Sequence, residues 1–236
     1  MGKKEIYFLI LLVLILFAIN YNFLDGKVTG FLTQGDFKSV HVERVIDGDT
    51  IVTENETIRL LGINSPERGE EFYDEAREFL EKEILNKTVR VEFVGEREDK
   101  YYRTLAYIHF NGKNINVKMV ENGFANYYFY SGKDKYSNDL ENAWRTCLDN
   151  NVNLCEKSED ICAQCISIDS GSVKNSCAFD CNVSGWEIKG EGRKKFSFEG
   201  ELESGKSKEF SLDLSDSGGS LFLKDKEGKL VLWESY

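Results

Sequence analysis

The segment from Arg44 to Glu67 places the strongest constraint on the fold of this chain. Its β-branched residues alternate with polar ones in two short runs, which Asp-Gly-Asp and Glu-Asn-Glu clusters interrupt as turns. The polar side chains at the ends of these runs are Asp47, Asp49, Arg59, Asn64 and Glu67. Carboxylate and amide oxygens suit Ca²⁺, and a guanidinium suits a pair of phosphate oxygens. The segment therefore predicts a β-meander that carries metal-assisted chemistry on a phosphodiester.

Helical patterns follow this meander at three places. In residues 70–85 the apolar side chains share one face, residues 116–122 form a short helical stretch before Gly123, and residues 140–148 carry an i, i+3, i+4, i+7, i+8 stripe. Alternating strands at residues 89–93 and 105–108 lie between the first two helices. This order predicts a small β-barrel of the OB type with three helices over one side.

Beyond Cys155 the composition changes to glycine, serine and short alternating apolar runs. About six short strands separated by glycine-containing turns are typical of an immunoglobulin-like β-sandwich. One of the predicted strands contains Phe210, Leu212 and Leu214. We predict a barrel domain over residues 38–155 and a sandwich domain over residues 160–236, and the sandwich shows no cluster that resembles a catalytic site.

The N-terminal 24 residues indicate membrane targeting. Lys3 and Lys4 precede an apolar run from Ile6 to Ile19, and no small-x-small cleavage site follows Ala18. The run is shorter than the roughly 20 residues of a comfortable span, so both an uncleaved signal-anchor and a cleaved signal peptide stay open. Either places the bulk of the chain outside the cytoplasm, at the cell surface or secreted, with residues 25–37 as a tether.

The six cysteines all lie between Cys147 and Cys181, which is typical of a disulfide region or a zinc site. The targeting segment favours disulfides, because these form outside the cytoplasm. Cys147 and Cys155 could form one bridge at the end of the third helix, but six cysteines permit 15 pairings.

A formal net charge of −11 argues against a broad basic surface that grips nucleic acid. Any contact with phosphate must therefore be local.

Three motifs in order, at residues 45–50 (Val-Ile-Asp-Gly-Asp-Thr), 58–67 (Ile-Arg-Leu-Leu-Gly-Ile-Asn-Ser-Pro-Glu) and 99–108 (Asp-Lys-Tyr-Tyr-Arg-Thr-Leu-Ala-Tyr-Ile), resemble the thermonuclease family, also called staphylococcal nuclease-like. The resemblance implies an OB-fold and a Ca²⁺-dependent phosphodiesterase that acts on DNA and RNA.

The resemblance also implies roles for individual residues. Asp49 would bind Ca²⁺ directly, with Asp47 in support and the backbone carbonyl of Ser65 completing the protein's ligands. Arg59 and Arg103 would hold the scissile phosphate and stabilise its developing charge. Glu67 would orient or deprotonate the attacking water.

Lys100, Tyr101 and Tyr128 resemble the family's positions for the terminal phosphate and the base. The aromatic run 127–130 permits a shift of one residue in this match, and the same run could instead form barrel core.

Two positions depart from the family pattern. Asn64 stands where an aspartate ligand is usual, so its carbonyl oxygen can bind Ca²⁺ without adding charge, and we expect weaker metal binding. Tyr102 stands where a glycine commonly precedes the arginine.

The C-terminal region resembles the lamin-tail family more weakly, through residues 181–188, Gly218-Gly219 and residues 224–231. This resemblance implies a binding or spacing module whose partner is unknown.

Taken together, the nuclease motifs and the targeting segment lead us to expect an extracytoplasmic nuclease with a nucleic-acid substrate and a membrane contact through its N-terminal segment. The alternative is a surface module that binds nucleic acid, or an adhesion module, without turnover.

Overall fold

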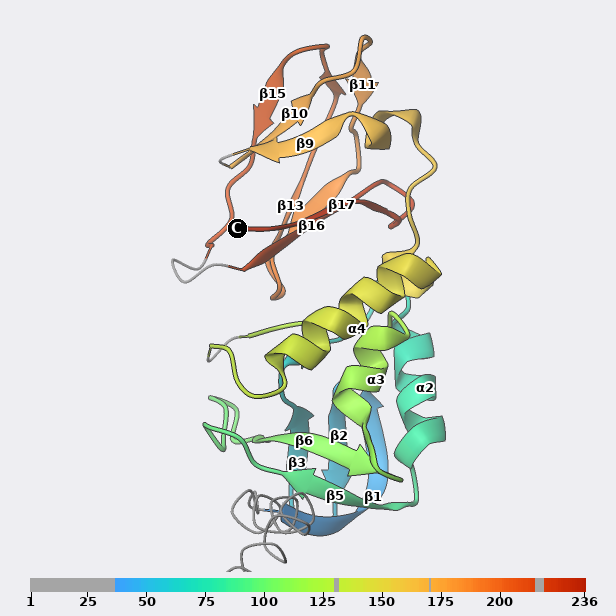
Figure 1. The fold of residues 1–236 in the computed structure, drawn as a ribbon, viewed down its shortest axis with the longest axis vertical. Coiled ribbons are helices and arrows are strands. Elements are labelled where there is room, and N and C mark those ends of the chain that lie inside the picture. Colours follow the sequence, from blue (N-terminus) through green and yellow to red (C-terminus); the bar gives the residue numbers. More distant parts are fainter. Residues whose placement is uncertain (1–36, 130–131, 170, 215–218) are drawn as a thin grey trace, which may run out of the picture. The chain divides into compact units, whose positions relative to one another are not determined.

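The computed structural model describes residues 37–129, 132–169, 171–214 and 219–236 (Figure 1). The residues from Lys38 to Tyr236 form one compact unit. The predicted targeting segment, residues 1–24, and the predicted tether up to residue 36 lie outside the described residues. In the part of the chain that is described, no helix is both long enough and apolar enough to cross a membrane.

A five-stranded barrel confirms the first part of the predicted fold. Its main sheet has the order β3-β2-β1-β5-β6-β7, and β3 also pairs with β6 in parallel, which closes the sheet on itself (Figure 1). The strands are β1 (Phe37–Asp47), β2 (Thr50–Thr53), β3 (Thr57–Leu60), β5 (Thr88–Glu92), β6 (Thr104–Phe110) and β7 (Lys113–Asn114), with a separate pair β4 (Ile63–Asn64) and β8 (Asn126–Tyr127).

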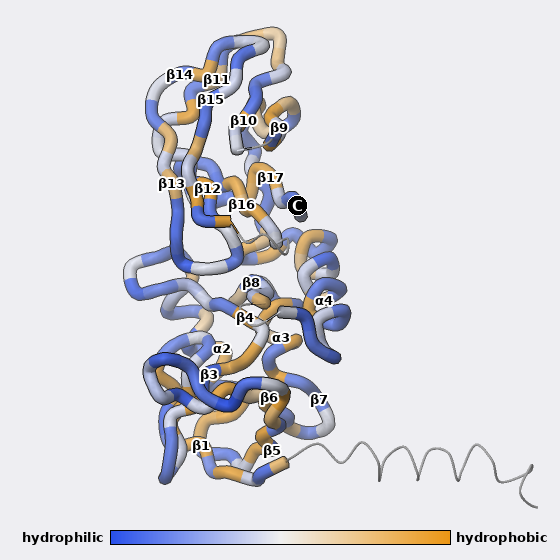
Figure 2. The backbone as a smooth tube through the Cα atoms, turned by 90° about the vertical axis from the view of Figure 1, so that its left-hand side faces the viewer, coloured by the Kyte–Doolittle hydropathy of each residue, from blue (hydrophilic) through white to orange (hydrophobic). Residues whose placement is uncertain are grey.

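The three predicted helices are present with nearly the expected bounds: α2 (Tyr73–Ile84), α3 (Ile115–Glu121) and α4 (Ser137–Asn150). In α4 the predicted stripe is the buried face, with Leu140, Ala143, Trp144 and Cys147 all inaccessible to solvent or nearly so. Hydrophobic and hydrophilic positions are interspersed along the barrel strands and the helices (Figure 2). The helices bury one face, whereas β6 buries four consecutive residues and so packs on both sides.

The C-terminal region consists of short antiparallel strands in three small sheets. After the 3₁₀ turns η1 (Asn153–Cys155) and η2 (Ile161–Gln164), the sheet orders are β15-β10-β9, β11-β14 and β13-β12-β16-β17. The strands are β9 (Ile166–Asp169), β10 (Ser172–Asn175), β11 (Cys181–Asn182), β12 (Glu187–Lys189), β13 (Lys195–Ser197), β14 (Glu201–Leu202), β15 (Ser207–Glu209), β16 (Ser220–Lys224) and β17 (Leu230–Ser235).

One predicted strand of this region is wrong. β15 ends at Glu209, so the alternating residues Phe210, Leu212 and Leu214 lie outside any described strand. Phe210 and Leu212 instead pack on the second hydrophobic core as loop residues. The alternation of apolar and polar residues here arises because loop side chains pack on the core, and not because the segment is a strand. The immunoglobulin-like arrangement and the division into two domains stay predictions.

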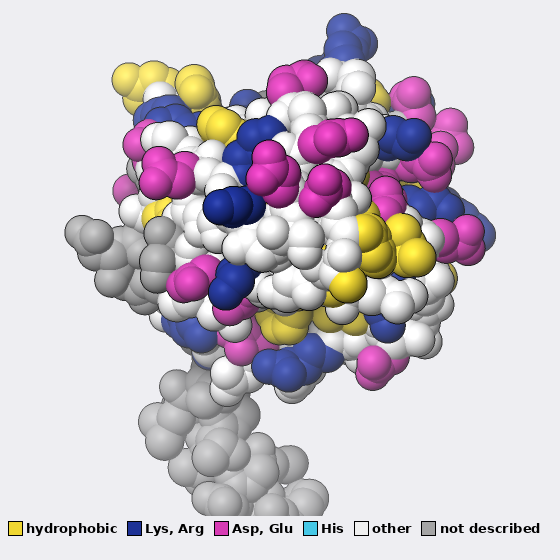
Figure 3. Space-filling model, turned by 90° about the horizontal axis from the view of Figure 1, so that it is seen from above, with side chains coloured by type: hydrophobic (Ala, Val, Ile, Leu, Met, Phe, Trp, Pro, Cys, Tyr) yellow, Lys and Arg dark blue, Asp and Glu magenta, His cyan; other side chains and the backbone are white. Residues whose placement is uncertain are grey.

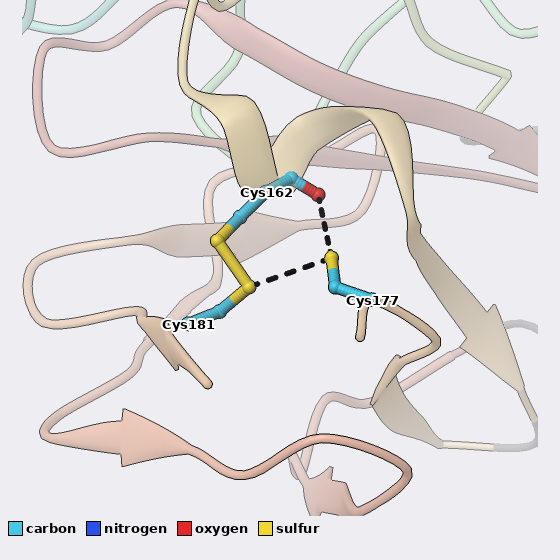
Figure 4. A group of neighbouring side chains, drawn as sticks. All are labelled: Cys162, Cys177 and Cys181. Carbon is cyan, nitrogen blue, oxygen red and sulfur yellow. Dashed lines mark hydrogen bonds between the residues drawn. A yellow bond between two sulfur atoms is a disulfide. The ribbon is translucent and has the colours of Figure 1, made fainter. Parts of the chain in front are cut away.

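Disulfides account for all six cysteines: Cys147–Cys155, Cys162–Cys181 and Cys165–Cys177. The first is the bridge expected at the end of α4. Figure 4 shows Cys162, Cys177 and Cys181 gathered closely enough for a metal, yet each sulfur atom is already in a disulfide. The structure therefore supports the disulfide alternative over zinc.

Residues of β16 and β17 join the hydrophobic core of the barrel, while the other buried C-terminal residues form the second core. Phe222 and Leu230 belong to the same buried cluster as the barrel residues, and the Phe222 ring meets the Trp144 ring edge-on with centroids 5.1 Å apart. The buried Tyr127 hydroxyl contacts the Ser220 hydroxyl and accepts a hydrogen bond from Trp233 Nε1 at 3.1 Å. Tyr127 is therefore core, which decides between the two interpretations of that residue.

Candidate metal and phosphate site

Closure of the barrel brings together motifs that are distant in the sequence. Arg59 on β3 lies opposite Thr50 on β2 and beside Leu105 on β6. Since Arg103 directly precedes β6, its side chain reaches the same end of the barrel, where its Nη1 lies 3.5 Å from Thr50 Oγ1. The parallel β3–β6 pairing thus assembles the two arginines around the end of β2.

Asp49 is the centre of this site and is almost fully buried. Its Oδ2 accepts hydrogen bonds from the Ser65 backbone N–H at 2.8 Å and the Ser65 hydroxyl at 2.9 Å. Its Oδ1 lies 3.0 Å from Arg59 Nε and accepts from the Thr50 hydroxyl at 3.0 Å. An ionised carboxylate has about four lone-pair sites, and these four donors occupy them, so they orient Asp49 and at least one of them would give way to a bound cation.

Gly48 lets the Asp47–Asp49 turn lie against Ser65 and helix α2. A Cβ atom on Gly48 would come within 2.7 Å of Ser65 Cβ and 2.8 Å of Ala76 Cβ, closer than atoms can approach. Only glycine therefore allows the two carboxylates and the Ser65 backbone to occupy neighbouring positions.

Burial and, next, the neighbouring Asp49 carboxylate together raise the pKa of Asp47 to about 6, against hydrogen bonds that lower it. The Asp47 Oδ1 atom accepts the Asp49 backbone N–H at 3.1 Å. Two carboxylates in one partly buried turn therefore repel each other, and a bound cation would relieve that repulsion.

The donor set fits a hard cation. It comprises the Asp47 and Asp49 carboxylates, the Asn64 side-chain carbonyl and the Ser65 backbone carbonyl, all oxygens, with Asp49, Asn64 and Ser65 buried. The Asn64 Oδ1 atom also accepts a hydrogen bond from Arg59 Nη2 at 3.3 Å, so its oxygen already faces the cationic side of the site.

The two predicted phosphate-binding arginines are held by different partners. Arg59 is buried and donates to Asp49, to the Leu60 carbonyl at 2.6 Å and to Asn64. Arg103 is more open and pairs with Asp99, with Nη2 at 2.6 Å and Nε at 2.7 Å from Asp99 Oδ2. Burial alone would raise the pKa of Asp99, but its hydrogen bonds from Arg103 lower it.

Glu67 lies at the start of the segment that leads into α2, half-exposed, and its backbone N–H donates to Glu70 Oε2 at 2.9 Å. Its carboxylate does not contact Arg59 or Arg103 in any described hydrogen bond or ion pair. Instead, Glu67 Oε1 lies 2.6 Å from Nε of Arg193, a residue of the loop between β12 and β13 in the C-terminal region.

The predicted nucleotide-binding residues lie on two separate loops. Lys100 and Tyr101 share the loop that ends in Arg103, and both the Lys100 ammonium (5.1 Å) and the Arg103 guanidinium (5.5 Å) lie over the Tyr101 ring. Tyr101 is 61% exposed, which leaves its ring open to a ligand. Tyr128 follows β8 and is positioned by its backbone N–H, which donates to the Gly62 carbonyl at 2.8 Å.

Sequence reasoning missed three residues of this site. Thr50 and Asp99 lie inside the quoted motifs. Thr50 directly follows its partner Asp49, and Asp99 lies four residues before its partner Arg103, so closeness in the sequence could have indicated both contacts. Arg193 offered no such signal, because its proximity to Glu67 depends on how the C-terminal strands pack against the barrel.

Comparisons with known proteins agree with this geometry. The profile described as "Staphylococcal nuclease homologue" matches residues 57–157. The thermonuclease of Staphylococcus intermedius is 34% identical over 143 residues, 56% of this chain and 85% of that protein. The thermonuclease of Staphylococcus hyicus is 31% identical over 122 residues, 48% of this chain and 72% of that protein.

A Bacillus subtilis protein named endonuclease YncB is 34% identical over 110 residues, which cover 42% of this chain and 52% of that protein. The matches thus extend from staphylococcal thermonucleases to an endonuclease of another genus, and the profile spans the second and third of the three motifs. From its barrel, from the site at the end of β2 and from these relatives, we conclude that the chain belongs to the staphylococcal nuclease family.

Proposed function

We propose that this chain is a Ca²⁺-dependent nuclease that hydrolyses the phosphodiester bonds of DNA or RNA with little sequence specificity. Relatives of this family are named thermonuclease and endonuclease, which supports the assignment as a phosphodiesterase of the hydrolase class. The observation that carries the proposal is the Asp49 cluster, where Arg59, Ser65 and Thr50 all contact one buried carboxylate. Contacts of arginine with phosphate carry no base information, which accounts for low sequence specificity.

In the proposed reaction, water attacks the phosphorus atom in line with the leaving oxygen. A Ca²⁺ ion held by Asp49, Asn64 and the Ser65 carbonyl, with Asp47 in support, would supply positive charge beside the scissile phosphate. Arg59 and Arg103 would donate hydrogen bonds to the phosphate oxygens as negative charge builds on them. Glu67 would hold the attacking water and take its proton.

Arg59 is fixed before substrate arrives, because Asp49, Asn64 and the Leu60 carbonyl all accept from it. A buried arginine in a fixed orientation loses little freedom when it binds phosphate, which favours transition-state stabilisation over flexible capture. Arg103, which contacts Asp99, Thr50 and the exposed Tyr101 ring, is less buried than Arg59 and would complete the pair when the phosphate enters.

We propose further that the protein acts outside the cytoplasm, at the cell surface or secreted. The three disulfides support this location, because such bonds persist mainly in oxidising compartments. Separation of a producing culture into cytoplasm, membrane and medium, with thiol labelling before and after reduction, tests this. Protein found in the cytoplasm with six reactive thiols would contradict it.

The C-terminal strands carry the resemblance to lamin-tail domains, and we propose that they serve in binding as an immunoglobulin-like module. On the face drawn in Figure 3, acidic and basic side chains are interspersed. That face would therefore recognise a partner through local contacts and not through a surface of a single charge.

The decisive experiment incubates the chain from Phe37 onward with single-stranded DNA and with RNA, in Ca²⁺ or in chelator. We expect cleavage in Ca²⁺ that chelator abolishes and that the double variant Glu67→Ala, Arg103→Ala loses. The variant Glu75→Gln, which neutralises an exposed carboxylate on α2, serves as the control and should cleave like the wild type. Substrate that is bound but stays intact in Ca²⁺ would support the alternative, a nucleic-acid-binding module without turnover.

A further inference from the structure

The loop that joins β12 to β13 reaches across to the candidate site from the C-terminal region. Its first anchor is Glu191, whose backbone carbonyl accepts from Asn126 Nδ2 at 3.0 Å and whose carboxylate accepts from the Phe129 backbone N–H at 3.0 Å. Burial raises the pKa of that carboxyl. These two hydrogen bonds fix the loop on the barrel beside strand β8.

The tip of the same loop lies between two predicted substrate contacts. A Cβ atom placed on Gly192 would lie 3.5 Å from the Tyr128 hydroxyl, and Arg193 Nε lies 2.6 Å from Glu67 Oε1. The loop therefore connects the position expected for a nucleotide base with the position expected for the general base.

Arg193 is held less firmly than the two arginines of the barrel. Its side chain is 56% exposed and that of Glu67 is 39% exposed, so their ion pair is a surface pair of the kind that contributes little to stability. By contrast, Arg59 is buried among three acceptors. A guanidinium in an exposed pair can exchange a carboxylate for a phosphate with little penalty, and phosphate offers it two oxygens in a matching geometry.

A cavity of about 670 Å³ lies beside the loop, and Tyr128 is the one predicted site residue in its lining as described. Aromatic and cationic side chains contribute to its lining, which suits the bases and phosphates of a single strand: Tyr128, Phe129, Trp233, Arg145, Arg193 and Lys194. The acidic groups of the lining are each engaged, Glu141 with Lys133, Asp213 with Lys194, and Glu191 with the Phe129 N–H.

We propose that Arg193 is a substrate-binding residue: it leaves Glu67 to bind a backbone phosphate of a single-stranded nucleic acid that lies along the β12–β13 loop. The exchange has a second consequence, since it frees the Glu67 carboxylate for the attacking water only when substrate is present. The C-terminal region would then form part of the substrate path. This inference rests on the proposed nuclease function and adds to it a contact outside the barrel.

Salt dependence of binding tests the contact directly. Full chains of wild type, R193A and R193K are titrated with fluorescent single-stranded DNA in chelator over a range of salt concentrations. Each phosphate contact contributes about 0.7 to the slope of log binding constant against log salt for single strands. We expect R193A to lose about that much of the slope and R193K, which keeps the charge, to retain it.

Kinetics in Ca²⁺ give the second measurement. We expect R193A to raise KM about ten- to hundredfold, the effect of one lost charge-assisted contact, with kcat within about twofold of the wild type. The matched control is K195A, which removes the same charge from the same hairpin where Lys195 pairs with Glu187. K195A should keep the wild-type slope and KM.

Three results would overturn the inference. An unchanged slope and KM in R193A would show a surface ion pair without a role, and an equal loss in K195A would show general attraction by charge. A higher kcat in R193A with unchanged KM would make the contact inhibitory. A wild type that binds the strand but does not cleave it would overturn the nuclease proposal alone, because the slope still reports on Arg193.

Discussion

Asn64 is the residue whose chemistry most affects the proposed metal site. Its buried side-chain oxygen faces Arg59 Nη2 at 3.3 Å, so an aspartate fits this position sterically and would gain a charged partner. We expect Asn64→Asp to bind Ca²⁺ about tenfold more tightly, because affinity at such sites rises with ligand charge. Calorimetric titration with Ca²⁺ alone measures this, with Asn142→Asp on α4 as an isosteric control. Equal affinity in both variants would exclude Asn64 from the metal's ligands.

Tyr102 carries a local conformational strain next to Arg103. Its φ of 61° lies in the left-handed region, which a bulky residue rarely adopts, and its side chain is 88% exposed. We expect Tyr102→Gly to leave the free energy of unfolding unchanged or to raise it by up to about 1 kcal/mol, because relief of strain offsets the greater freedom of glycine when unfolded. Tyr102→Val should destabilise by about 1–2 kcal/mol. Urea denaturation measures the free energy of unfolding of both variants. A valine variant as stable as the glycine variant would show that the backbone at Tyr102 is not strained.

At the scale of elements, β5, β6 and the start of α4 meet in a buried ionic cluster. Glu92 Oε2 accepts from the Tyr136 hydroxyl at 2.6 Å and lies 2.9 Å from His109 Nε2, while Lys135 pairs with Glu92 Oε1. Burial lowers the pKa of His109 and repulsion by Arg90 and Lys135 adds to this, although Glu92 opposes the shift. A histidine whose folded pKa is depressed stabilises the protein above its unfolded pKa near 6.5, and that stability is lost as pH falls through the folded value.

We therefore expect the free energy of unfolding of the wild type, relative to His109→Gln, to decrease as pH falls below about 6.5. The comparison cancels the contribution of Asp47, which is the same in both proteins, and reports on His109 together with its contact to Glu92. Denaturation curves at several pH values between 4 and 8 measure the difference. A difference that does not vary with pH would show that His109 does not titrate differently in the two states.

The structural elements differ in how well the sequence could predict them. The barrel strands and three helices were predicted because their periodicities are local, and the motifs around Asp49 and Arg59 were predicted because a hairpin brings them together. The β3–β6 closure, the burial of Phe210 from a loop and the approach of Arg193 to Glu67 depend on contacts between distant segments. No local pattern encodes such contacts, so the sequence could not predict them.

At the scale of the molecule, the shared core makes the stability of the barrel depend on the C-terminal strands. Phe222 is 1% exposed and packs edge-on against both Trp144 and Tyr127, while Trp233 donates to the Tyr127 hydroxyl. Removal of such a buried ring leaves a cavity and loses its aromatic contacts. We expect Phe222→Ala to lower the free energy of unfolding by about 3–5 kcal/mol, within the range measured for large-to-small core changes.

How far the destabilisation by Phe222→Ala spreads shows whether the barrel and the C-terminal strands unfold as one cooperative unit or as two separate domains in contact. Since Phe222 belongs to the same core as the barrel residues and lies opposite Lys189 of β12, hydrogen exchange in Phe222→Ala should accelerate at the amides of β6 as well as at those of β12. The control Phe179→Ala removes a phenylalanine that is 42% exposed and should leave exchange at both strands unchanged. Acceleration confined to β12 would show that the barrel is stable by itself. Acceleration at both would mean that the barrel, its site and the loop that carries Arg193 fold together.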